Sequence, residues 1–93
     1  MIIARRFIVR GRVQGVGFRY FAILAARKCG VVGTVRNMAD GSVEAVAEGP
    51  ADAVAEFRRA LERGPSYSHV TAVEESELQP TGRNKDFGVV RSQ

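Results

Sequence analysis

The sequence predicts an α+β fold in which two helices cover one face of a mostly antiparallel sheet. In several short segments apolar residues alternate with polar ones, which is typical of strands with one covered face. Two further segments carry apolar residues at helical spacing and are bounded by glycine or proline. The resulting order is β-α-β-β-α-β with a short extra C-terminal strand, which is the order of a ferredoxin-like sandwich.

The first strand and the first helix follow from two different periodicities. Residues 3–13 alternate between apolar side chains and arginines, so we expect a strand with one face in the core and the other, including Ile8, in water. Residues 19–29 place apolar side chains three or four positions apart, which predicts a helix. Gly30 is suited to end that helix in a left-handed conformation.

A β-hairpin and a second helix are expected next. Residues 31–38 are rich in β-branched side chains and lead into Asp40-Gly41, a dipeptide that favours tight turns. Residues 42–48 alternate again and complete the hairpin. Residues 51–63 carry a helical stripe that begins after a Gly-Pro pair, because proline is tolerated in the first turn of a helix.

The last third of the chain predicts two weaker strands. Residues 70–78 read as an exposed edge strand because glutamates interrupt the apolar pattern, and His69 falls in the loop before it. Residues 79–85 read as a polar loop, and residues 87–91 as a short final strand. The connections are all short, which predicts a single domain over residues 1–93.

Composition restricts the functional classes. The chain has 93 residues, a formal net charge of +4 and a single cysteine, so a disulfide framework is excluded and acidic ligands are favoured. No Cys/His cluster has the spacing of a zinc site, so no metal is expected. No apolar run approaches the length of a membrane span and none reads as a signal peptide, so we expect no membrane contact and a cytoplasmic location.

The segment 11–19 predicts an anion-binding site. Its three glycines allow the backbone to turn so that consecutive N–H groups face one point, and the first turn of the following helix adds further free N–H groups. Arg19 supplies a planar, permanently charged fork that matches two oxygens of a phosphate. The segment lacks the Lys-Ser/Thr ending of a nucleotide phosphate loop and the spacing of a dinucleotide fingerprint, so ATP and NAD are disfavoured.

Asn37 is the second candidate of the site. The first two strands of the expected layout run parallel, so the C-terminal end of the second strand lies at the same sheet edge as the glycine segment. An asparagine cannot act as a base, but it can hold a water in line with a bound phosphorus. The only histidine, His69, has no partner for nucleophilic catalysis. A carboxylic-phosphoric anhydride suits such a site, because its carboxylate leaving group has a pKa of about 4 and needs no proton or metal.

The chain resembles an acylphosphatase over essentially its whole length, and its first matching segment is highly specific. The matching segments are Gly-Arg-Val-Gln-Gly-Val-Gly-Phe-Arg at 11–19, Ala-Arg-Lys-Cys-Gly-Val-Val-Gly at 26–33, Val-Arg-Asn at 35–37, Asp-Gly-Ser-Val-Glu at 40–44 and Glu-Gly-Pro at 48–50. The sequence departs from the family at Thr34, where a large aromatic residue is common.

The resemblance implies a monomeric enzyme that hydrolyses small-molecule acyl phosphates to a carboxylate and orthophosphate without a cofactor. It implies that Arg19 binds the phosphoryl group, that Asn37 orients the attacking water, and that the substrate's own phosphate assists deprotonation of that water. The backbone amides that would form a cradle for phosphate or another oxyanion belong to Arg12, Val13, Gln14, Gly15 and Val16.

Two other functions on the same scaffold stay open at this level. The domain could bind a phosphorylated ligand without hydrolysing it, or it could bind single-stranded RNA. Binding of RNA on this fold needs exposed aromatic side chains on the central strands for base stacking. Phe7 is expected on the apolar face and the third strand has no aromatic residue, so nucleic acid is disfavoured as a partner.

Overall fold

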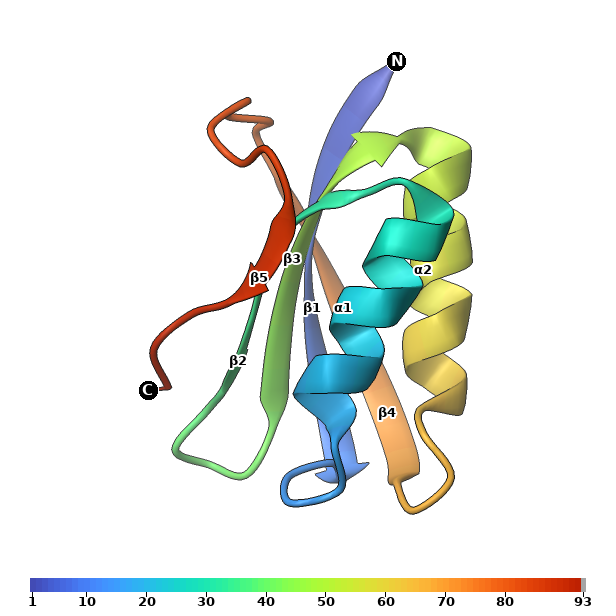
Figure 1. Cartoon of the computed structure of the whole chain (residues 1–93), viewed down its shortest axis with the longest axis vertical. Coiled ribbons are helices and arrows are strands. Elements are labelled where there is room, and N and C mark those ends of the chain that lie inside the picture. Colours follow the sequence, from blue (N-terminus) through green and yellow to red (C-terminus); the bar gives the residue numbers. More distant parts are fainter. Residues whose placement is uncertain (93) are drawn as a thin grey trace.

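The computed structural model describes residues 1–92 and confirms the expected order of elements (Figure 1). The elements are β1 (Ile2–Arg12), α1 (Phe18–Cys29), β2 (Val32–Asn37), β3 (Val43–Pro50), α2 (Ala51–Arg63), β4 (His69–Leu78) and β5 (Phe87–Val89). Each boundary lies within about two residues of the expected one, which is the usual uncertainty of element ends. His69, expected in a loop, is instead the first residue of β4 and pairs with Arg12.

The five strands form one sheet in the order β4-β1-β3-β2-β5, with both helices on the same face (Figure 1). β3 pairs antiparallel with both β1 and β2, so β1 and β2 run in the same direction, as expected. β5 pairs parallel with β2 at the edge of the sheet. The β1–α1 loop and the β2–β3 turn therefore lie at the same end of the molecule (Figure 1).

The core lies between the sheet and the two helices. Phe57 of α2 stands edge-on to Phe7 of β1 and to Phe87 of β5, with ring centroids 6.1 and 5.3 Å apart. All three rings are fully buried. Such contacts stabilise beyond the area they bury, because the positive edge of one ring meets the negative face of another. They hold the helix layer against both the middle and the edge of the sheet.

The face of the sheet that no helix covers is less exposed to solvent than the sequence indicated. Ile8 was expected in water, but only 8% of its surface is exposed, so that expectation is wrong. Ile8 lies between Glu44 and Glu74 on the neighbouring strands. Arg6 pairs with Glu44 at 2.7 Å, and Arg10 pairs with Glu74 at 2.9 Å. The aliphatic stems of these arginines cover apolar surface while their charged ends are paired.

The loop after β4 is fixed to this same face by Glu48. Only 5% of the Glu48 surface is exposed, and its carboxylate accepts hydrogen bonds from the Thr81 N–H at 2.5 Å and the Gly82 N–H at 3.2 Å. The Thr81 hydroxyl donates a third hydrogen bond. The backbone N–H of Thr81 is the main cause that lowers the pKa of Glu48. This contact directs the chain toward β5.

We expect Glu48→Gln to reduce stability at neutral pH by about 2 kcal/mol, because it removes charge-assisted hydrogen bonds. The folded state lowers the pKa of Glu48, so the charge stabilises the protein above the unfolded value of about 4.3 and stops doing so as the pH falls through the folded value. Urea unfolding at several pH values should show the difference between wild type and Glu48→Gln shrinking in acid. Glu77→Gln is the control, since the Glu77 side chain is 84% exposed, and a similar loss in that variant would contradict the assignment.

Candidate active site

The loop between β1 and α1 has a backbone built to bind an anion. Gly15 and Gly17 adopt φ values of 74° and 78°, whereas every residue other than glycine in the described range 1–92 has negative φ. The sign of φ therefore alternates from Gln14 to Gly17, and this alternation turns successive N–H groups toward the same side in an anion-binding concavity. Within residues 1–92 these four N–H groups donate to no backbone acceptor.

The N-terminus of α1 extends this set of free donors. Its first internal hydrogen bond is donated by the Phe21 N–H to the Gly17 carbonyl, so the N–H groups before Phe21 have no partner in the helix. The first turn contains no acidic residue that would offset the positive end of the helix dipole. Arg19 lies in this turn, is exposed, and makes no ion pair with a carboxylate of the described part of the chain. Its guanidinium is free to bind a ligand.

Asn37 faces the same space from the end of β2. Val35 is fully buried against the helices, and Asn37 lies two residues further along the strand on the same face. A cavity of about 440 Å³ opens between this strand end, the glycine loop and α1. Its lining residues are Val13, Gly15, Gly17, Phe18, Arg19, Tyr20, Ile23, Asn37 and Val89.

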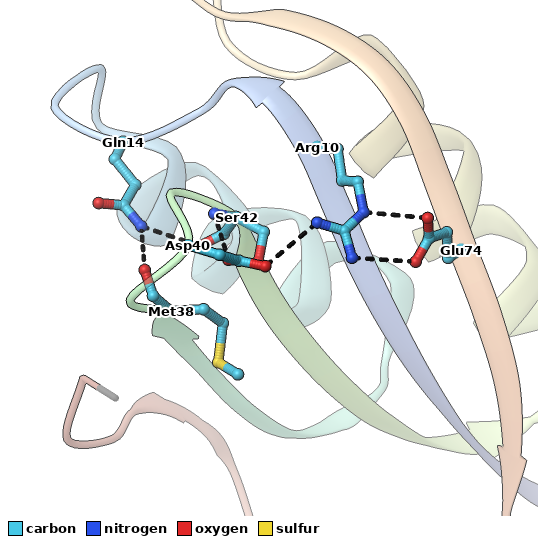
Figure 2. Close-up of polar contacts among 6 residues, drawn as sticks. All are labelled: Arg10, Gln14, Met38, Asp40, Ser42 and Glu74. Atoms are coloured by element: carbon cyan, nitrogen blue, oxygen red, sulfur yellow. Dashed lines mark hydrogen bonds and ion pairs between the residues drawn. The ribbon is translucent and has the colours of Figure 1, made fainter.

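The cavity brings together four of the residues that the sequence indicated: Val13, Gly15, Arg19 and Asn37. The other three have different surroundings. Arg12 ends β1, and Val16 is partly buried against the core. The Gln14 side chain turns away from the loop toward the β2–β3 hairpin, as Figure 2 shows.

Gln14 connects the two halves of the site. Its side-chain amide donates a hydrogen bond to the Met38 carbonyl at 2.8 Å and another to the Ser42 carbonyl at 2.9 Å (Figure 2). These carbonyls flank the turn that follows Asn37, so the glycine loop and the asparagine are tied by one side chain. Spacing could not reveal this contact, because it depends on how the loop and the hairpin meet in space.

The hairpin turn is itself fixed by Asp40. The Ser42 hydroxyl and backbone N–H, followed by the Arg10 guanidinium, lower the pKa of Asp40 to about 2. Arg10 also pairs with Glu74 of β4 (Figure 2). A row of charges thus runs from the edge of the sheet to the turn that positions Asn37.

Thr34 lies away from the cavity. It precedes the buried Val35 on β2, so its side chain lies on the opposite face of the sheet from Asn37 and the helices. The departure from the family at this position therefore leaves the wall of the cavity unchanged.

Five lining residues are not among the expected site residues: Gly17 and Phe18, which lie within the segment 11–19, and Tyr20, Ile23 and Val89. Ile23 could have been found, because it lies one helical turn after Arg19 and so on the same face of α1. Tyr20 follows Arg19 directly, and adjacent residues of a helix do not share a face, so spacing could not place it in the wall. Val89 could not be found either, because its place depends on the parallel pairing of a three-residue strand with β2.

The cavity has donors but no group that could act as a base. Its lining residues include no carboxylate and no imidazole, and Arg19 is the only charged one. In residues 1–92 no three His, Cys, Asp or Glu side chains come together as metal ligands. The arrangement can bind an oxyanion and hold a water beside it.

The sheet offers no platform for stacking bases. The two strand aromatics, Phe7 and Phe87, are buried in the core. Ion pairs of Glu44 with Arg6 and Arg36 occupy the face that no helix covers. This arrangement argues against the RNA-binding alternative. Neither helix of the described chain has the length and apolarity to cross a membrane.

Comparison with known proteins gives one consistent result. Residues 5–89 match the acylphosphatase family. The chain is 51% identical over 78 residues to an acylphosphatase of Solibacter usitatus, covering 84% of this chain and 81% of that protein. It is 47% identical over 90 residues to an acylphosphatase of Actinobacillus succinogenes, covering 97% and 100%. The crystal structure of the Bacillus subtilis acylphosphatase superposes with a TM-score of 0.91 at 42% identity, covering 98% of this chain and all of the other.

We expect Gln14→Met to lower the free energy of unfolding by about 2 kcal/mol, because the two lost hydrogen bonds each contribute about 1 kcal/mol. Methionine preserves the length of the side chain, and both carbonyls keep a backbone partner in the hairpin. Urea unfolding measures the change. Gln79→Met, at an exposed position after β4, is the matched control. Equal stability of the two variants would show that the Gln14 contact does not hold the loop to the hairpin.

Proposed function

This chain belongs to the acylphosphatase family and hydrolyses acyl phosphates, and we propose that it does so with Arg19, the loop amides and Asn37 as its working groups. The observation that carries the proposal is the shared cavity: free N–H groups, an unpaired guanidinium and a carboxamide border it, with no carboxylate among them. Such a site attracts a doubly charged phosphoryl group and repels none of its oxygens.

The phosphoryl group would occupy the concavity of the glycine loop. The free N–H groups from Gln14 to Gly17 would donate to its oxygens, and the N-terminus of α1 would add its dipole. Arg19 would donate two parallel hydrogen bonds from its guanidinium. Because these donors are fixed by the fold, they can stabilise the charge on phosphorus in the transition state without rearranging.

Asn37 would hold the attacking water opposite the acyl oxygen. The water oxygen forms a bond to phosphorus, the bond between phosphorus and the acyl oxygen breaks, and its electron pair leaves on the carboxylate. The proton of the water passes to a phosphate oxygen of the substrate. A carboxylate is a good leaving group at neutral pH, so the reaction needs neither a general acid nor a cofactor.

We also propose that residues 1–93 act as a single-domain monomer in the cytoplasm. The five strands of the described chain form one sheet, with one core between it and the two helices, which supports a single domain. The only cysteine, Cys29, is a free thiol, as is usual for proteins of reducing compartments.

We expect Arg19→Ala to abolish both phosphate binding and turnover, and Arg19→Lys to fail nearly as badly, because an ammonium cannot copy the two-pronged contact of a guanidinium. Removing one partner of a charge pair with a bound ligand costs roughly 2–5 kcal/mol, or about 30-fold or more in affinity. Hydrolysis of acetyl phosphate in the presence of EDTA, with inhibition by orthophosphate, measures both effects.

Arg27→Ala is the matched control for Arg19, since it removes an arginine two turns further along α1 and breaks only an exposed ion pair with Asp86. This control should keep wild-type activity. Near-normal turnover in either Arg19 variant would refute the proposed role.

We expect Asn37→Ala to lower kcat by about 100-fold while leaving inhibition by orthophosphate unchanged, because placement of the water is lost but the phosphate donors stay. Steady-state kinetics with parallel phosphate inhibition separates the two effects. Asn84→Ala, in the loop before β5, serves as the control. Weaker phosphate inhibition with unchanged kcat would instead make Asn37 a phosphate-binding residue.

A further inference from the structure

A second cavity lies between α1 and α2, apart from the cavity around Arg19 and Asn37. Its volume is about 420 Å³, and all of its lining residues belong to these two helices. Among the residues of the described chain, the two cavities have no lining residue in common. This helix groove opens to solvent, because Leu24 and Arg63, which line it, are exposed.

The middle of the helix groove is apolar. Phe21, Leu24 and Ala25 line it from α1, and Ala60 lines it from α2. Burial is the main cause that raises the pKa of the Cys29 thiol, so this lining residue is neutral at neutral pH and counts as apolar. Positions 21 and 28 are two helical turns apart, so the groove runs about 10 Å along α1. Leu24 is 47% exposed, and an aliphatic chain in the groove would remove it from water.

One end of the groove presents a cation without a partner. The two helices run in opposite directions, so the end of α2 lies beside the start of α1 (Figure 1). A side chain added at Gly64, directly after α2, would meet the ring of Phe18, the first residue of α1. Arg63, the last residue of α2, therefore borders the groove at its Phe21 end. Within residues 1–92 Arg63 makes no ion pair with a carboxylate, so its guanidinium can bind a ligand anion.

The charges at the other end of the groove are balanced. Lys28 and Glu56 both line this end and carry opposite charges. The Glu56 carboxylate also accepts a hydrogen bond from Arg59 at 2.5 Å, and this bond is the main cause that lowers the pKa of Glu56. A ligand anion is therefore favoured at the Arg63 end, with an apolar part along the rest of the groove.

We propose that the helix groove binds a medium-chain aliphatic carboxylate, with the carboxylate on Arg63 and the chain along Phe21, Leu24 and Ala60. Octanoate has about ten non-hydrogen atoms and occupies roughly 300 Å³ at about 30 Å³ for each of them, so the cavity can hold it. A cavity of this size is typical of small-molecule sites, which measure about 300–1,000 Å³. The inference does not rest on the proposed function, because the groove contains none of the hydrolytic groups.

Titration calorimetry with octanoate, hexanoate and octylammonium tests the ligand chemistry. We expect octanoate to bind about tenfold more tightly than hexanoate, because its longer chain removes more apolar surface from water. Octylammonium should bind at least about tenfold more weakly than octanoate, because its charge is repelled by Arg63. Equal binding of octanoate and octylammonium would overturn the proposal.

Two substitutions test the position of the ligand. Arg63→Gln and Leu24→Gln should each weaken octanoate about fivefold, because one removes the ion pair and the other the apolar contact. Arg83→Gln and Leu78→Gln are the matched controls, since both positions are exposed and lie outside the groove. All four variants should hydrolyse acetyl phosphate like the wild type, which shows that they are folded. Losses in the controls as large as those in the groove variants would refute the site.

Two further measurements decide between this ligand and other occupants. Octanoate should bind Arg19→Ala as tightly as the wild type, because Arg19 lies outside the groove. Loss of binding in Arg19→Ala would place octanoate in the hydrolytic cavity and overturn the proposal. Sedimentation velocity should give one value for the wild type and Leu24→Gln, whereas a dimer that Leu24→Gln dissociates would make a second copy of the chain the occupant instead.

Discussion

The site depends on four backbone N–H groups that the fold leaves without a partner. An unpaired N–H is costly when buried, so a loop that keeps several of them free has to expose them to water or to a ligand. Glycine at positions 15 and 17 makes this possible, because φ values of 74° and 78° are strained for any residue with a side chain. The same geometry brings the chain directly into α1, whose first turn continues the row of donors. Backbone N–H groups thus form the binding site, and the Arg19 guanidinium adds further donors to it.

A donor set of this kind is useful only if the group across the cavity keeps a fixed distance from it. Here the two segments lie beyond the paired ends of β1 and β3: the β1–α1 loop and the turn of the β2–β3 hairpin. The Gln14 side chain connects them by donating hydrogen bonds to two carbonyls of the hairpin. The Asp40 carboxylate stabilises the same turn by accepting a hydrogen bond from the Ser42 N–H. The bonds from Gln14 tie the loop to the turn beside Asn37, and a fixed geometry of this kind is what placement of a water against a bound phosphorus requires.

Much of this arrangement could be read from the sequence because it depends on local rules. The alternation of apolar and polar residues predicts the strands, and apolar residues at helical spacing predict α1 and α2. Because β1 and β2 run in the same direction, Asn37 lies at the same edge of the sheet as the glycine loop. Three features depend on contacts between distant segments and could not be read. These are the burial of Ile8 under paired arginines, the side-chain bonds of Gln14, and the position of Val89. The last depends on a loop whose course is set by the buried carboxylate of Glu48.

The carboxyl groups with lowered pKa values stabilise the fold, and they are distinct from the groups that line the cavity. Three of the carboxyl groups whose pKa values are lowered, Asp40, Glu44 and Glu48, lie outside the cavity and hold a turn, two arginines and a loop. For Glu44, burial alone would raise the pKa, but the bonds from Arg6 and Arg36 outweigh it. Perturbed groups more often mark catalytic centres. Here the cavity is lined instead by fixed dipoles, one permanent charge and a neutral amide, and these suit a reaction whose leaving group departs without a proton.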